Sequence, residues 1–353
     1  MRRMYEPKYR LTNSILISIG KIEAAKETIE SAPLLPMWER RFRESAMVRA
    51  AHHGTHIEGN QLAFEEARQV LLSQDLHAAR SRDVQEVLNY RAVLDYIGEE
   101  WGSGKKEMNE AMLKKLHKLV VFKMLPDELS GNFRTKKVVI KDSSTGEITF
   151  TPPDPADIPF MISEFVKWLQ QAERSEVHPV LKAGIAHHEF VRIHPYLDGN
   201  GRVARALSTL ILYVEQYDIR RFFSLEEQYD NDPLSYYHSL QKANEGDLTP
   251  WLEYFCQKLT EELELLKGKI KRLSLDSKIK NKLGGKQVFL NERQAKIMEF
   301  MQEAGYVQNQ AFDTMFPEYS EDTILRDLND LIEKRIVKKI GKTKGAKYVL
   351  AKS

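Results

Sequence analysis

Most of the chain carries the spacing of amphipathic helices, with apolar residues recurring every three or four positions. The first such segment, 15–29, ends at two prolines and reads as an N-terminal arm that packs on the rest of the protein. The same pattern predicts helices over 37–51, 64–72, 84–96, 113–122, 158–170, 181–193, 200–213 and 251–265. The chain is therefore expected to be mainly α.

Two segments depart from this helical pattern. Val138, Val139 and Ile140 are β-branched, 142–146 contains turn-forming residues, and 148–150 is again strand-like. This order predicts a β-hairpin. Nearer the C-terminus, helical patterns at 290–302, 309–316 and 321–334 precede two strand-like segments, 336–340 and 347–350. They predict a second, smaller domain of mixed α and β structure.

Composition sets broad limits on what the protein does. Of 353 residues, 42% are apolar and 29% charged, as in a soluble globular protein, and the net charge of +2 indicates no general attraction to nucleic acid or membranes. No apolar run is long enough to cross a membrane, and no signal peptide is recognisable, so we expect a cytoplasmic protein. Cys256, the single cysteine, lies in an apolar run typical of a core position.

A twelve-residue segment, 194–205, holds the most chemistry. Gly199 and Gly201 permit positive φ and close approach to the backbone, just where a helix begins. The first amide hydrogens of a helix lack partners inside it, and the helix dipole favours an anion there. Arg202 and Arg205 lie three residues apart on one face of that helix, where their guanidinium groups can bind phosphate oxygens.

Two further side chains of this segment face the same space. Asp198 precedes the glycines, and its carboxylate is the kind of ligand that Mg²⁺ takes together with phosphates. Pro195 places His194 at a helix end, where it could accept a proton from an attacking hydroxyl. The bland alternative is a simple turn with a capping aspartate and solvated arginines. A zinc-protease motif is excluded, since His188-Glu189 would need a histidine where Arg192 stands.

The segment His-Pro-Tyr-Leu-Asp-Gly-Asn-Gly-Arg-Val-Ala-Arg resembles the signature of Fic domains and departs from it only at Tyr196, where that signature has phenylalanine. The resemblance implies a Fic-type helical bundle that transfers AMP from ATP to a hydroxyl side chain of a protein. It also implies the roles of the residues: His194 as general base, Asp198 as Mg²⁺ ligand, Gly199, Asn200 and Gly201 as anion hole, and Arg202 and Arg205 as triphosphate ligands.

Many Fic proteins carry an inhibitory helix with the pattern Ser/Thr-x-x-x-Glu-Gly/Asn, and Glu58-Gly59 resembles its end. The resemblance implies that Glu58 pairs with Arg205 and so obstructs the γ-phosphate. This sequence departs at the first position of the pattern, which is Gly54, with Thr55 one residue later. A lone glutamate near a helix end is otherwise usually a solvated or capping residue.

Two other elements gain a meaning from the same resemblance. The hairpin that includes Val138, Val139 and Ile140 is similar to the flap, which holds the target protein as an added strand. Tyr237 belongs to an element near the nucleotide base and is expected to touch adenine. From the residues alone, the alternative for the hairpin is a surface feature with no role, and an aromatic at helical spacing is more often core.

We therefore expect four regions: an N-terminal helical region with the inhibitory helix (1–112), the catalytic domain (113–264), a basic linker (265–286) and a winged helix-turn-helix domain (287–353). The last could enter a DNA major groove with its third helix. However, that helix carries Glu321, Asp322, Asp327 and Asp330, which repel phosphate, so a role in protein interaction or dimerisation stays open.

The leading hypothesis is an ATP- and Mg²⁺-dependent protein adenylyltransferase inhibited by Glu58, with another protein or the chain itself as acceptor. A second hypothesis is a DNA-binding regulator whose Fic-like domain senses a nucleotide. A third keeps the chemistry but transfers a different phosphate-containing group or removes AMP. Self-association into a homo-oligomer is a further expectation from the family.

Overall fold

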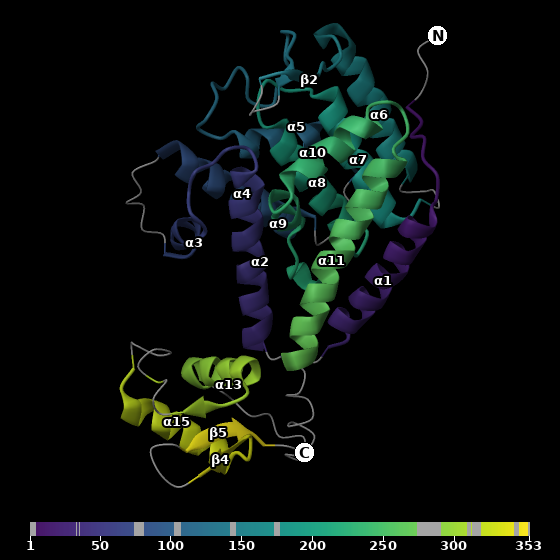
Figure 1. Ribbon diagram of the computed structural model, residues 1–353. Coiled ribbons are helices and arrows are strands. Elements are labelled where there is room, and N and C mark those ends of the chain that lie inside the picture. Colours follow the sequence, from purple (N-terminus) through teal and green to yellow (C-terminus); the bar gives the residue numbers. More distant parts are fainter. Residues whose placement is uncertain are drawn as a thin grey trace. The chain divides into compact units, whose positions relative to one another are not determined.

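The computed structural model describes residues 5–32, 34, 36–73, 81–101, 107–141, 146–172, 177–273, 291–308, 312, 319–341 and 346–351. The chain divides into two compact units (Figure 1). The first is built from Met1–Glu30 and Met37–Leu266, and the second from Lys267–Ser353 with the short segment Ser31–Pro36. The first unit contains the 194–205 segment.

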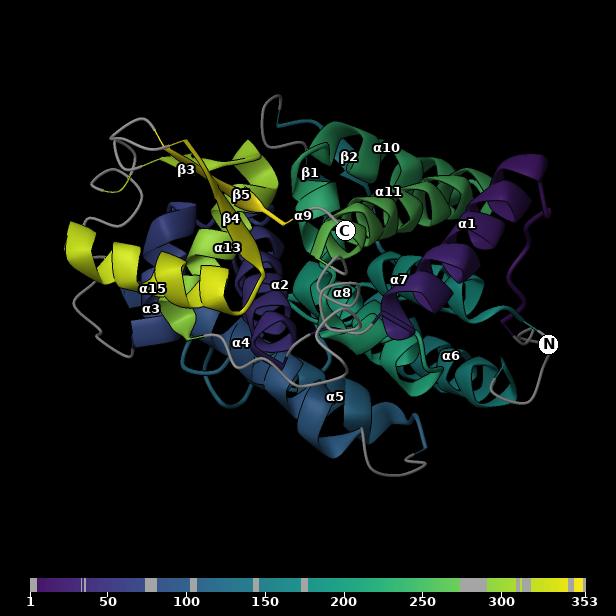
Figure 2. The ribbon, with the colours of Figure 1, turned by 90° about the horizontal axis from the view of Figure 1, so that it is seen from below.

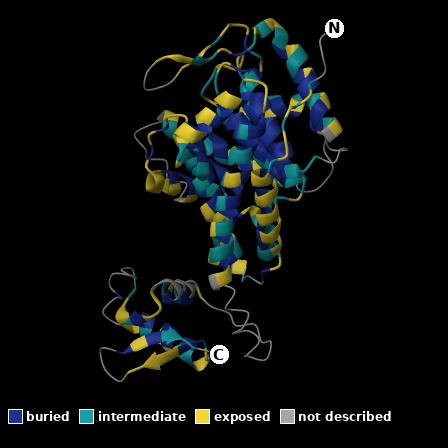
Figure 3. Ribbon diagram, turned by 45° about the vertical axis from the view of Figure 1, so that its right-hand side comes forward, coloured by how far each residue is buried: buried dark blue, intermediate teal, exposed yellow. Residues whose placement is uncertain are grey.

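The first unit is a helical bundle centred on α7 (Pro179–Ile193) and α8 (Asn200–Val214), which pack against each other (Figure 1). Every residue of α7 from 180 to 190 is buried, including the polar Lys182, His187, His188 and Glu189. This helix therefore lies inside the bundle, whose centre is mainly dark blue in Figure 3. The helices around them are α2 (Pro36–His56), α3 (Phe64–Ser73), α4 (Ser81–Glu100), α5 (Glu110–Val120), α6 (Ile158–Ala172), α9 (Leu225–Asp230), α10 (Pro233–Ala243) and α11 (Thr249–Leu273).

The predicted N-terminal arm is helix α1 (Asn13–Glu30), and it packs on α11 (Figure 2). The Thr12 hydroxyl donates to Glu253 over 2.6 Å, and Thr260 donates to the carbonyl of Ser18 over 3.3 Å. Buried isoleucines line the inner face of α1. Their burial stabilises the packing of the arm, and the two hydrogen bonds fix its orientation. Cys256 of α11 is buried, as its apolar neighbours predict.

The mainly α fold is confirmed, and most predicted helices form, several of them with longer bounds than the pattern indicates. Helix α2 continues to His56, beyond the expected end at 51, and stops before Gly59, whose φ is 98°. Helix α11 continues to Leu273, into the segment expected to be the basic linker; residues 274–286 lie outside the described part. Among the described helices, none combines the length and the apolar character that a membrane span requires.

The predicted hairpin forms but is shorter than the sequence indicates. Strand β1 (Ile140–Lys141) pairs antiparallel with β2 (Ile148–Phe150), and the register shifts between the two residues of β1. Val138 and Val139 precede the paired residues instead of belonging to the ladder. Their β-branched side chains favour an extended backbone, but the pairing itself depends on a partner strand that is only three residues long.

The second unit contains α13 (Glu292–Ala304), β3 (Val307–Gln308), α15 (Glu321–Glu333), β4 (Val337–Ile340) and β5 (Lys347–Leu350). The two predicted wing strands pair antiparallel, and β3, which the pattern did not predict, joins them in the order β3-β5-β4. Ile324, Leu328 and Leu331 of α15 are buried in the core of this unit. The helix expected over 309–316 lies outside the described residues apart from Phe312, which is buried.

Candidate active site

His194 lies at the end of α7 with its backbone in the left-handed region, at φ 49°. This conformation is uncommon for a residue with a side chain and turns the chain sharply into the loop. The ring nitrogen Nδ1 lies 3.3 Å from the carbonyl oxygen of Val191. Because a carbonyl only accepts, this contact assigns the hydrogen to Nδ1 and leaves Nε2 as an acceptor.

The protonation state of His194 follows from its surroundings. Burial lowers the pKa of the imidazole to about 4, although the Val191 carbonyl and the carboxylates of Glu58 and Asp198 act in the opposite direction. The ring is therefore neutral at pH 7. A neutral imidazole with Nε2 unprotonated is the form that can accept a proton.

The loop after His194 is held closed by its own side chains. Asn200 accepts a hydrogen bond from the backbone of Tyr196 and donates one back to its carbonyl, both over 2.9 Å. Tyr196 is fully buried and stacks on His117 of α5, with ring centroids 3.7 Å apart. His117 also bonds the Asp198 carbonyl through Nε2 over 3.0 Å. The Asn200 side chain thus shapes the loop, so only its backbone amide is left for an anion hole.

Arg134 joins the loop to the flap. Its Nε donates to the carbonyl of His194 over 2.8 Å, and its two terminal nitrogens donate to the carbonyls of Lys136 and Pro153. Its backbone amide donates to the carbonyl of Pro195 over 2.9 Å. Residues before and after the hairpin are therefore fixed to the segment that carries His194.

Glu58 lies against the start of α8. Its Oε1 atom is 2.7 Å from a terminal nitrogen of Arg205, and that nitrogen also donates to the carbonyl of Gly54 over 2.8 Å. A Cβ added to Gly201 would come within 2.1 Å of the same Oε1 atom, so the carboxylate occupies the space directly over this glycine. A phosphate bound by the first amides of α8 would need that space.

The charges of this pair are retained on burial. Burial by itself would raise the pKa of Glu58, but Arg205 and then Arg202 outweigh it and hold the pKa below its usual value. Burial would likewise lower the pKa of Arg205, and Glu58 raises it well above its usual value. In the described structure, Nε and Nη1 of Arg205 are buried without a hydrogen-bond partner. Buried guanidinium donors of this kind are available to an anion.

Asp198 is held beside the helix start by several donors. Its Oδ1 atom accepts from Arg202 over 2.9 Å and from the Gly199 amide over 2.5 Å. Its Oδ2 atom lies 3.7 Å from a nitrogen of Arg82, an exposed side chain. Among the described residues, no cluster of three or more histidine, cysteine or acidic side chains forms a metal site. A single carboxylate with an accessible oxygen still suits Mg²⁺, which keeps several waters and binds substrate phosphates.

Tyr237 and the hairpin lie on neighbouring elements. The Tyr237 hydroxyl donates to the carbonyl of Ile57 over 3.2 Å, and 47% of the residue is exposed. Gln241, on the same helix α10, donates to the carbonyl of Thr149 in β2 over 3.3 Å. Tyr237 is thus close to the segment that carries Glu58, and about half of the residue is exposed.

The structure explains why glycine occupies position 54. A Cβ there would lie 3.0 Å from the Tyr90 ring and 3.2 Å from Cγ of Glu226. The Tyr90 hydroxyl donates to Glu226 over 2.8 Å, so this pair fills the space that a serine or threonine side chain would need. Packing from α4 and α9 is therefore a steric reason for glycine at this position.

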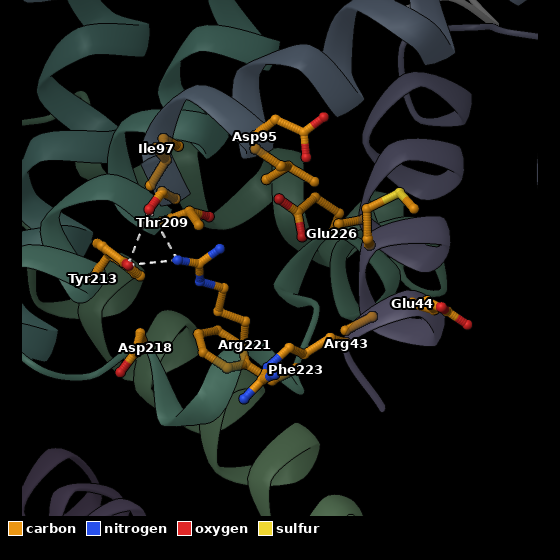
Figure 4. A pocket seen from close by; sticks show the side chains of 15 residues that line it. Arg43, Glu44, Asp95, Ile97, Thr209, Tyr213, Asp218, Arg221, Phe223 and Glu226 are labelled. Carbon is orange, nitrogen blue, oxygen red and sulfur yellow. Dashed lines mark hydrogen bonds between the residues drawn. The ribbon is translucent and has the colours of Figure 1, made fainter. Parts of the chain in front are cut away.

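Glu226 also lines a cavity of about 260 Å³ between α2, α4 and α8 (Figure 4). Arg221 reaches into it and donates to the Tyr213 hydroxyl over 2.6 Å and to the carbonyl of Gly98 over 3.0 Å. None of the lining residues belongs to 194–205, so this cavity is separate from the loop that carries the candidate chemistry.

Residues 107–212 match the model of the Fic/DOC family. The chain contains a Fic domain. It is 30% identical over 227 residues to the protein adenylyltransferase Fic of Drosophila yakuba, covering 64% of this chain and 43% of that protein. To the protein of the same name from Culex quinquefasciatus it is 28% identical over 246 residues, covering 69% and 46%. The chain thus spans less than half the length of these curated relatives.

The fold of the chain is also similar to that of solved Fic structures. A Fic family protein from Desulfovibrio desulfuricans G20 superposes with a TM-score of 0.65 at 21% identity over 98% of both chains, which shows a shared fold. Fic-1 from C. elegans superposes with a TM-score of 0.59 at 25% identity, covering 72% of this chain and 73% of that one. The resemblance inferred from the signature is confirmed at the level of the Fic domain.

The signature residues come together around the start of α8, as the spacing predicts, and Glu58 reaches Arg205 from a segment far away in the sequence. Two contributors were missed by the sequence reasoning, His117 and Arg134. Both act through backbone carbonyls of the loop, and their partners lie distant in sequence, so spacing alone offers no signal for them.

Proposed function

We propose that this protein is a protein adenylyltransferase that transfers AMP from ATP to a hydroxyl side chain and is inhibited by Glu58. The observation that supports this most directly is the neutral His194, with Nε2 free to accept, beside a helix start that offers amides and two arginines to phosphate. The name of the relatives, protein adenylyltransferase, supports the same activity.

In the proposed reaction, the acceptor hydroxyl gives its proton to Nε2 of His194. Its oxygen forms a bond to the α-phosphorus of ATP, the bond from that phosphorus to the oxygen bridging to the β-phosphate breaks, and pyrophosphate leaves. The backbone amides of Gly199, Asn200 and Gly201, together with Arg202 and Arg205, stabilise the negative charge of the phosphates. Tyr237 would contact the adenine.

Asp198 is the residue that would hold Mg²⁺, and the ion when bound would offset the charge of the phosphates. The protein holds this carboxylate ready through Arg202 and the Gly199 amide. The geometry around Asp198 is therefore set before a nucleotide binds.

The acceptor would be an extended protein segment that lies along the hairpin, at Val138, Val139 and Ile140. The backbone of Val138 and Val139 lies outside the β1–β2 ladder, so it is not used in that pairing and is available to an added strand. Arg134 couples this segment to His194, which would align an acceptor hydroxyl with Nε2. The protein itself is a candidate acceptor besides a separate target.

The test is mass spectrometry of the Glu58→Gly variant after incubation with ATP and Mg²⁺, with and without cell lysate. An added AMP on serine, threonine or tyrosine is the expected result. A different phosphate-containing adduct would show that another group is transferred. Loss of AMP from a previously modified protein would indicate the reverse reaction.

The low pKa of His194 predicts an unusual pH profile. At a pKa of about 4, the ring stays neutral throughout the range from pH 8 to pH 5.5, so AMP transfer by Glu58→Gly should stay nearly constant there. Removing Glu58 also removes a carboxylate that raises the pKa, which strengthens the expectation. A histidine with an ordinary pKa near 6.5 would lose about tenfold in rate by pH 5.5. Initial labelling rates across this range distinguish the two.

We propose a second, separate candidate function for the C-terminal unit, which is DNA binding. Two of the acids that argue against it are neutralised within the unit. Asp327 is 2.6 Å from Arg293, and Asp330 is 2.5 Å from Lys334. Lys338 and Lys339 of strand β4 are exposed and suit phosphate contacts.

Binding of the full chain to duplex DNA should be measured by fluorescence anisotropy across a salt series. DNA binding predicts an affinity that falls steeply with salt and falls further in Lys338→Glu/Lys339→Glu. Lys21→Glu, which reverses the charge of an exposed lysine in α1, serves as the control. Equal affinities for the double variant and the wild type would reject the wing as a DNA contact.

A further inference from the structure

Glu86 of α4 reaches the first arginine of the signature from outside the catalytic segment. Its Oε1 atom lies 3.4 Å from Nη1 of Arg202, and both side chains are buried. The other terminal nitrogen of Arg202 is 2.9 Å from Oδ1 of Asp198. Both terminal nitrogens of this arginine therefore lie near carboxylates, and Nη1 also donates weakly to Sδ of Met124 over 3.9 Å. Its Nε is buried without a partner in the described structure.

A second cation, Arg82, interacts with Glu86 more weakly than Arg202 does. Arg82 lies 3.6 Å from the same Oε1 atom, but its side chain is 71% exposed. Exposed ion pairs contribute little because water and salt screen them. Arg202 is thus the main electrostatic partner of this buried carboxylate.

Asn60 connects Glu86 to the inhibitory segment. It follows Glu58 by two residues, and its side-chain amide donates to Oε2 of Glu86 over 3.0 Å and to the carbonyl of Asp83 over 2.9 Å. Its Oδ1 atom accepts from the amide of Leu62 over 3.1 Å. Asn60 is buried and uses its whole amide, so it ties the segment that carries Glu58 to α4.

The two phosphate-binding arginines are therefore occupied in parallel. Glu58 pairs with Arg205 over 2.7 Å, and Glu86 pairs with Arg202 over 3.4 Å, in addition to the shorter contact of Arg202 with Asp198. A guanidinium paired with a buried carboxylate must give up that pair before it binds phosphate, so each carboxylate competes with the triphosphate. Because Asn60 bonds Glu86, movement of residues 58–60 away from the site would disturb both pairs together.

We propose that Glu86 is a second competing carboxylate, which holds Arg202 away from the triphosphate and is coupled through Asn60 to the segment that carries Glu58. This inference rests on the proposed function, since it presumes ATP as the ligand of these arginines. Glu86 is a positioning residue and takes no part in the reaction itself.

The test uses Glu86→Gln in the full chain. Glutamine has nearly the same volume and can still accept from Asn60, but it carries no negative charge for Arg202. Dissociation constants for ATP and for AMP, each with Mg²⁺, are measured by isothermal titration calorimetry. ATP affinity should rise about 3- to 10-fold, which is less than a full charge-assisted hydrogen bond would give, because Glu86 and Arg202 form an ion pair at 3.4 Å. AMP affinity should change less than about twofold, since AMP has one phosphate.

The readout is the ratio of the two dissociation constants, which a merely structural effect would not move. Glu164→Gln is the matched control, because Glu164 is also 8% exposed and pairs with Lys167 on α6 instead of with the site. An unchanged ratio in Glu86→Gln, or weaker ATP binding, would overturn the competition.

The coupling through Asn60 has its own variant. Asn60→Ala should shift the ratio in the same direction, and Asn60→Ala/Glu86→Gln should shift it no further than Glu86→Gln alone. Full additivity would overturn the coupling. The proposed function fails separately, if the wild type and Glu58→Gly neither bind ATP nor transfer AMP. If Glu58→Gly transfers AMP while the ratio stays constant in Glu86→Gln, only the inference fails.

Discussion

Replacing Glu58 with glycine should raise the rate of AMP transfer about 10- to 100-fold, because one charge-assisted hydrogen bond of about 1.5–3 kcal/mol no longer competes with phosphate for Arg205. The substitution also clears the space over Gly201, where the carboxylate would come within 2.1 Å of an added Cβ. Incorporation of α-labelled ATP, with the protein itself or lysate proteins as acceptors, measures the effect.

Glu58→Gly removes a charge and also makes the backbone more flexible, so two control variants separate these effects. Glu58→Gln keeps the size of the side chain and should give a smaller increase, since the amide still fills part of the space. Glu128→Gly changes an exposed glutamate in a turn outside the site and should leave the rate unchanged. If Glu58→Gly labels no faster than the wild type, the inhibitory role of Glu58 is wrong.

Replacing His194 with alanine in the Glu58→Gly background should lower AMP transfer by about 10²–10⁴-fold, the usual contribution of a positioned general base. The imidazole is neutral and has Nε2 free, so its loss removes the proton acceptor without removing any of the phosphate ligands. Labelling with α-labelled ATP measures the loss.

ATP affinity is the control for this second variant. His194→Ala should bind ATP with an affinity within a few-fold of its parent, because Arg202, Arg205 and the amides of α8 stay in place. Loss of ATP binding would mean that the loop had collapsed. His194→Asn would then test whether the side chain acts as the general base. Undiminished labelling with ATP binding retained would exclude His194 as the base.

Local patterns in the sequence were sufficient for much of the Fic domain. The signature residues lie within twelve positions, and the dihedral preferences of proline and glycine place them at a helix–loop–helix junction. Helical periodicity likewise located α7 and α8 to within two residues at their ends. Such features depend on near neighbours in the chain, which is why a sequence reveals them.

The hairpin could be predicted only in part from the sequence. β-branched residues indicated where the chain is extended, but the register and the bounds of β1 depend on pairing across a turn. The same holds for the acids of α15. As a sequence they appeared to repel phosphate, whereas Asp327 and Asp330 are paired with cations once the unit folds.

By itself, the sequence determined the candidate catalytic loop, the mainly helical fold and the candidate partners Glu58 and Arg205. Only the tertiary structure decided how these parts are held. Four residues contact the site from distant parts of the sequence, where helical periodicity gives no indication of the contact: His117, Arg134, Asn60 and Glu86. Gly54 became understandable through the Tyr90 ring packed against it. The physical reason is that helix and turn propensities act over a few residues, while buried polar groups find partners wherever the packed core brings them.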